Sequence, residues 1–170
     1  MKKILYGITA VLAFIVILVF ASNVTVIAQD AGQCASCLLK IPNESVIFYQ
    51  PFLYTINNIA FDVSGSEWDG NVFNAIWDAT SGLNGEGAFK FDGTNDYIDF
   101  GDVSSVENLG EITVSAWVKS NILTTGSGRF IVLKGSNSLT SPDASFYLYW
   151  DWDEKFAFRV RNATGALQVV

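Results

Sequence analysis

Histidine is absent from the 170 residues, and this absence excludes a large share of enzyme chemistry. Without imidazole there is no Ser-His-Asp triad, and most zinc sites lose their usual nitrogen ligand. Charged residues make up only 16% of the chain while half of it is apolar, which excludes a disordered chain and a coiled coil. The 17 acidic and 10 basic residues give a net charge of −7. A surface of this sign repels phosphate backbones, so nucleic-acid binding is not expected.

The beginning of the chain is an uncharged apolar run, residues 4–21, directly after two lysines. A helix of that length spans roughly 27 Å, just enough for the hydrocarbon core of a bilayer. The lysines before the run and the acidic residues after it place the N-terminus inside and the rest outside. We therefore predict an N-terminal hydrophobic helix within residues 1–28, which is either a signal peptide cleaved near Ala28 or a retained membrane anchor. Both alternatives make the protein extracellular, as a secreted or a membrane-anchored chain.

Cysteine is scarce, and its two copies, Cys34 and Cys37, lie in a short segment, residues 29–44, that we interpret as a spacer. No second pair and no histidine exist to complete a zinc site, and no βαβ pattern supports a thioredoxin-like motif. We predict a small disulfide loop between the two cysteines, with pairing to another chain as the alternative. In an exported chain, Asn43 and Asn162 head candidate glycosylation sequons.

The rest of the chain lacks helical periodicity and shows short alternating apolar runs separated by Gly, Asn, Asp and Ser clusters, which is typical of an antiparallel β-sandwich. In the clearest run, residues 111–119, Ile112, Val114, Ala116 and Val118 alternate with polar residues and Trp117. We expect strands at residues 45–49, 72–77, 87–91, 97–100, 111–119, 130–134, 146–152, 156–161 and 167–170.

Several motifs occur in the order found in one family. Residues 88–98, AFKFDGTNDYI, are similar to an "A-x-x-F-D-G-x-x-D-Y-V" hallmark, and residues 112–119, ITVSAWVK, to an "F-T-I-S-A-W-V-K" strand. Residues 61–72 and the strands at 131–135 and 146–149 continue the likeness. The chain resembles concanavalin A-like, laminin G-like jelly-roll domains. The resemblance implies an all-β jelly roll at residues 45–170, incomplete at its C-terminus because the family's following motifs do not appear. An exposed apolar edge strand at the end of the sequence would invite pairing with other chains, so we expect further domains downstream in the same chain. The alternative is a natural end whose final strand is internal to the sheet.

Calcium is the candidate cofactor. Asp92, Asn95 and Asp96 gather in one turn, and their oxygens are of the kind that calcium prefers. Asp143 resembles a position where pentraxin relatives supply a calcium ligand, although Ala144 replaces their usual neighbouring asparagine. The alternative for the turn is that its side chains bond backbone amides.

Ligand binding is expected at aromatic residues that can stack on sugar rings. The candidates are Tyr147, Tyr149, Trp150, Trp152 and Trp117. In a strand the two tyrosines share one face while Trp150 and Phe146 share the other, so one set is expected in the core and the other exposed. The alternative is that all of them pack inside the domain or at its rim.

Catalysis is not expected, because the visible chain lacks the paired-carboxylate spacing that glycosidases use. The resemblance implies an exported, non-catalytic module that binds carbohydrate or another ligand and serves adhesion at a cell surface, its partners being a glycan or a surface protein. Two alternatives stay open: a structural β module of a surface protein, and an accessory domain of a secreted glycosidase whose enzyme lies downstream.

Overall fold

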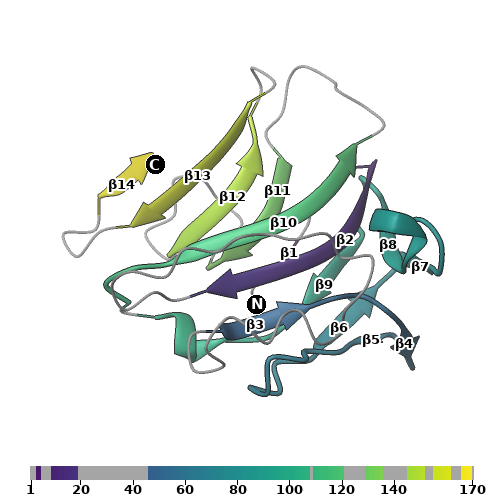
Figure 1. The fold of residues 1–170 in the computed structure, drawn as a ribbon. Helices are drawn as coiled ribbons and strands as arrows, with labels where there is room; N and C mark the ends of the chain where they lie inside the picture. The colour runs from purple at the N-terminus through teal and green to yellow at the C-terminus, as the bar shows by residue number, and fades with distance from the viewer. Residues whose placement is uncertain are drawn as a thin grey trace.

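The computed structural model describes residues 3–4, 9–18, 46–107, 109–120, 129–135, 145–151, 155–161 and 166–169. These residues form mostly antiparallel strands, together with the short 3-10 helices η3 (Leu83–Gly85) and η4 (Ser104–Val106). The strands are β1 (Lys3–Ile4), β2 (Thr9–Leu18), β3 (Val46–Gln50), β4 (Thr55–Ile56), β5 (Ile59–Ala60), β6 (Gly70–Phe73), β7 (Ile76–Asp78), β8 (Ala88–Asp92), β9 (Tyr97–Asp99), β10 (Thr113–Ser120), β11 (Arg129–Lys134), β12 (Phe146–Trp150), β13 (Phe156–Arg161) and β14 (Leu167–Val169) (Figure 1). The predicted all-β class is confirmed, and the architecture is consistent with a jelly roll.

The strands pair in three sheets. One sheet has the order β1-β9-β6-β5-β4, and a second has β10-β2-β8-β7 with β3 paired to β2. The third sheet, β11-β12-β13-β14, follows chain order (Figure 1). β1 also contacts β11, so the first and third sheets meet along this strand.

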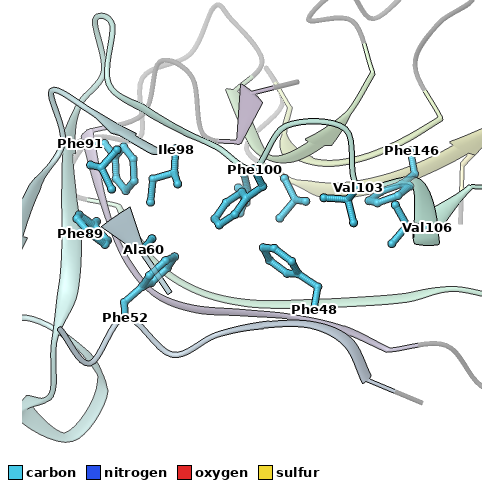
Figure 2. Close-up of a cluster of buried hydrophobic side chains, with 13 residues drawn as sticks. Phe48, Phe52, Ala60, Phe89, Phe91, Ile98, Phe100, Val103, Val106 and Phe146 are labelled. Carbon is cyan, nitrogen blue, oxygen red and sulfur yellow. The ribbon is translucent and has the colours of Figure 1, made fainter. Parts of the chain in front are cut away.

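The core cluster joins side chains from all three sheets, and its centre is aromatic. Phe48 of β3 meets Phe100 edge-on with ring centroids 4.6 Å apart, and Phe52 meets Phe89 at 5.2 Å in the same geometry. In Figure 2, Phe48 and Phe52 lie opposite Phe100 and Ile98 across the interior. Further buried members are Ala60, Val72, Phe91, Val103, Val106, Ile131, Val132 and Phe146. Alternate strand residues therefore fill one interior between layers, as a sandwich requires.

The alternation predicted for residues 111–119 is confirmed. Thr113, Ser115, Trp117 and Lys119 are exposed along β10, while Val114, Ala116 and Val118 pack against the core cluster. A strand with period two places one set inward and the other outward, so the pattern alone fixed the orientation of this strand.

Two local features differ from the predicted strands. The run expected at residues 72–77 is broken into β6 and β7, because Asn74 takes a positive φ of 60°. A hairpin of β4 and β5 was not anticipated. Its turn residues Asn57 and Asn58 both have positive φ, 52° and 59°, as a type I′ turn demands and asparagine tolerates.

The main correction concerns the apolar run at the start of the chain. Residues 9–18 form the strand β2 rather than the predicted helix. Periodicity does not separate a strand from an apolar helix when nearly every position is apolar, and five of the ten residues in β2 are β-branched, namely Thr9, Val11, Ile15, Val16 and Ile17. Among the described residues, no helix has the length and apolar character needed to cross a membrane. The predicted division at residues 28 and 44 stays a prediction.

Candidate functional site

The turn between β8 and β9 holds the predicted calcium ligands, and its carboxylates serve the backbone. The amide of Asp92 donates to Oδ2 of Asp96 over 2.7 Å, and the amide of Thr94 donates to Oδ1 of Asp92 over 2.7 Å. Asp96 is buried, whereas Asn95 is exposed. Gly93 has a φ of 83°, which lets the chain reverse at this point. These contacts fit the alternative in which the side chains stabilise the turn.

A calcium cage needs more oxygen ligands than this turn brings together. Across the residues that the structure describes, no group of three or more Asp, Glu, His or Cys side chains forms a metal cluster. Asp143 lies outside the described residues. The carboxylate oxygens of this turn therefore fit the capping of backbone amides better than the binding of a metal ion. Calcium binding stays a prediction.

Other predicted site residues also lie outside the described part of the chain. They are Trp152, Cys34, Cys37, Asn43 and Asn162. The disulfide and the glycosylation sites therefore stay predictions.

The aromatic strand β12 separates its side chains as its alternation predicts. Phe146 belongs to the core cluster, and Leu148 and Trp150 pack against it. Tyr147 and Tyr149 form a second cluster with Leu133, Phe130 and Ala157. The expectation that one of the two sets is exposed is wrong for the tyrosines, because Tyr147 is 0% and Tyr149 1% exposed, and the alternative of packing inside the domain fits both residues. Trp150 meets Phe156 edge-on at 4.5 Å, so its position favours packing over ligand contact.

Charged side chains surround the tyrosine cluster. The Tyr149 hydroxyl donates to Oδ2 of Asp151 over 3.0 Å, and the Arg159 guanidinium lies 5.2 Å from the Tyr149 ring centroid. Burial, and then the hydrogen bond to Asp151, raises the pKa of Tyr149 to about 12. Burial alone lowers the pKa of Arg159, but Tyr147, Tyr149 and Asp151 outweigh it and the net direction is upward. The cluster is therefore a neutral phenol beside a firmly cationic guanidinium at ordinary pH.

Among the predicted ligand residues that the structure describes, Trp117 is the exposed one. Its side chain is 47% exposed on the outer side of β10. Thr113, Ser115 and Lys119 are exposed in phase with it on the same strand. An indole face flanked by two hydroxyls and an ammonium offers both a stacking surface and hydrogen-bond donors.

The loop before β6 contains a polar centre to which the sequence assigned no role. The carboxylate of Asp62 accepts hydrogen bonds from the amides of Tyr49, Ser64 and Trp68 at 2.9, 3.0 and 3.1 Å, and from the Ser64 hydroxyl at 2.8 Å. The Asp62 amide in turn donates to Oδ1 of Asp69 over 2.8 Å. The Asp-x-Ser spacing is an Asx-turn signal that could have revealed this centre.

A buried ion cluster was missed as well. The Lys134 ammonium pairs with the carboxylates of Asp102 and of Glu107, the latter over 2.8 Å, and Lys134 is 4% exposed. The lysine ends β11 while its partners flank η4, so no local pattern in the sequence connects them. Its contacts assign Lys134 to structure rather than to ligand binding.

Comparison with known protein families gives a match to the second half of the chain. Residues 92–170 match the family model described as the concanavalin A-like lectin/glucanases superfamily. No curated protein and no solved structure gives a significant match. The family match confirms the predicted resemblance over these residues. At the level of this superfamily, laminin G-like domains are lectin-like or adhesion modules, typically extracellular and non-catalytic, that commonly bind glycans or proteins.

Proposed function

We propose that this domain is an extracellular, non-catalytic binding module whose ligand is a carbohydrate. The observation that carries the proposal is the exposure of Trp117 on the outer side of a regular strand, with Thr113 and Ser115 in phase. The superfamily match over residues 92–170, which includes β10, supports the same class of function.

The setting of Trp117 suits a binding contact. Its neighbours in sequence, Ala116 and Val118, pack on the core and fix the backbone beneath it. A rigid aromatic side chain loses little conformational entropy when a ligand covers it, so its apolar area contributes efficiently to affinity. The net charge of −7 disfavours anionic ligands, which leaves neutral sugars as the better match.

The tyrosine cluster of β12 takes a supporting place in this proposal. Tyr147 and Tyr149 are buried, so they shape the sheet that carries them instead of offering an open platform. Asp151 and Arg159 are partly accessible beside them and can bond sugar hydroxyls. Asp151 and Arg159 therefore form a second, weaker candidate contact.

The test is a glycan array of neutral oligosaccharides, followed by titration calorimetry with any sugar that binds. We expect Trp117→Ala to weaken binding about tenfold or more, the loss of roughly 1.4 kcal/mol typical of a truncated aromatic contact. Phe73→Ala is the matched control, because Phe73 is also exposed, at 41%, but lies on β6. Equal loss in both variants, or binding unchanged in Trp117→Ala, would overturn the assignment.

A structural module is one of the two alternatives that stay open, beside the accessory domain of a secreted glycosidase, and it makes a different prediction. The polar centres at Asp62 and Lys134 both hold the fold together, as a spacer domain requires. If no sugar on the array binds and no protein ligand is captured through Trp117, the spacer interpretation replaces the binding module.

A further inference from the structure

The strand β2 occupies a central position in its sheet. All of β10 pairs with it in antiparallel register, from Thr113 opposite Leu18 to Ser120 opposite Ala10. Its other edge pairs with β8 over residues 9–12 and with β3 over residues 15–18. Residues 10–12 and 15–18 therefore have paired neighbours on both sides.

Among the described residues, β2 is the strand that pairs with β10, and also the strand that pairs with β3. Taking β2 away would leave a gap between β10 and the pair β3 and β8, which we call the strand slot. The backbone N–H and C=O groups that face the slot would lose their partners, at a cost of about 1–3 kcal/mol for each group that stays buried. A chain without residues 9–18 thus faces a large penalty unless another strand fills the slot.

The residues of β2 are suited to two environments. Thr113 and Ser115 of β10 are exposed, yet their register partners are Leu18 and Val16. A strand whose sheet has one exposed face ordinarily alternates apolar and polar residues. The sequence of β2, TAVLAFIVIL, shows no alternation and equally suits a bilayer helix.

We propose that Thr9–Leu18 has two alternative structures. In the folded domain it is the strand that fills the strand slot, and during membrane targeting the same residues form part of the hydrophobic helix. Folding and membrane targeting then compete for these ten residues. While the segment is in the sheet it is withheld from the membrane, and its removal near Ala28 opens the slot. Trp117 lies opposite Phe14 in this pairing, so the filling of the slot also bears on the strand that carries the proposed ligand contact.

Cysteine cross-linking of the full chain tests the register. Val16 lies directly opposite Ser115, and directly opposed Cα atoms in antiparallel strands are about 4.5–5.5 Å apart, within the range that a disulfide bridges. With Cys34→Ser and Cys37→Ser in place, we expect Val16→Cys to link to Ser115→Cys under mild oxidation. Lys119→Cys is the control partner: it lies four residues along the strand, roughly 13 Å away, and should not link. Equal linking of both pairs, or no link in a chain with β-type circular dichroism, would overturn the proposal.

Hydrogen exchange gives a second measurement that does not depend on new cysteines. Val16→Pro removes an amide at a position paired on both sides, to Ser115 and to Tyr49. We expect at least a tenfold loss of protection along β10, whereas Ala31→Pro, placed after the segment, leaves β10 protected. Unchanged protection of the β10 amides in Val16→Pro refutes the proposal. So does a secreted chain that begins after Ala28 and whose β10 amides are still protected from exchange.

Discussion

The buried ion cluster at Lys134 leads to an asymmetric prediction. The Lys134 side chain is 5% exposed, whereas those of Asp102 and Glu107 are 67% and 39% exposed. Neutralising both acids with Asp102→Asn and Glu107→Gln would leave an ammonium buried without a counter-charge. Removing one side of a buried ion pair in this way costs about 3–5 kcal/mol of the free energy of unfolding.

The opposite change costs much less. Lys134→Met keeps the buried stem and leaves two carboxylates that water reaches, so the loss should be near that of a surface ion pair, about 0–1 kcal/mol. Lys119→Met, at an exposed lysine of β10, is the control and should change stability by less than about 0.5 kcal/mol.

Urea unfolding of the full chain, followed by tryptophan fluorescence, measures these differences. The slope of the free energy of unfolding against urea is about 1–3 kcal/mol per molar. The urea midpoint of the doubly neutralised variant should therefore lie on the order of one to several molar below that of Lys134→Met. If Lys134→Met is as destabilising as the double acid variant, the argument from unequal burial is refuted.

Three further changes test the packing, the tyrosine cluster and the turn. Gly70→Ala should cost about 1–3 kcal/mol in the same urea assay, because its Cβ would lie 2.3 Å from buried Phe100, whereas Gly110→Ala meets nothing within 4 Å and should be near neutral. Tyr149 has a raised pKa of about 12, so its contribution to stability is full below pH 10 and lost as the pH rises from 10 to 12; thermal melts should show this loss, and Tyr149→Phe should reduce it. Asp96→Ala should lower stability by about 1–3 kcal/mol equally with and without calcium, and a loss seen only with calcium would instead support a metal site.

Much of the fold could be predicted because the alternating strands carry their own signal. The parity of β10 followed directly from the order of its residues, and the separation of Phe146 from Tyr147 on β12 followed from the same rule. Burial of Tyr147 was one of two open alternatives, and the sequence could not decide between them, because alternation separates two faces but does not say whether either face is covered. The distinction depends on tertiary neighbours that lie elsewhere in the chain.

The candidate site was less predictable than the fold. Asp92 and Asp96 have the composition of a calcium loop and of an amide-capped turn, and only hydrogen-bond geometry distinguishes the two. Similarly, the run at residues 9–18 is apolar at nearly every position, so it satisfies the pattern of a membrane helix and of a central strand alike. Where two structures share one composition, the sequence does not choose between them.

The hydrogen bonds of Asp62 have a consequence for the order of folding. Its carboxylate oxygens accept hydrogen bonds from the amides of Tyr49 and Trp68, which are 13 and 6 residues away in sequence. The pairing of β10 with β2, in contrast, joins segments that are about 100 residues apart. Closing a short loop costs less chain entropy than closing a long one. The corner around Asp62 should thus be among the first tertiary contacts to form, and the long pairing of β10 should set the slow step.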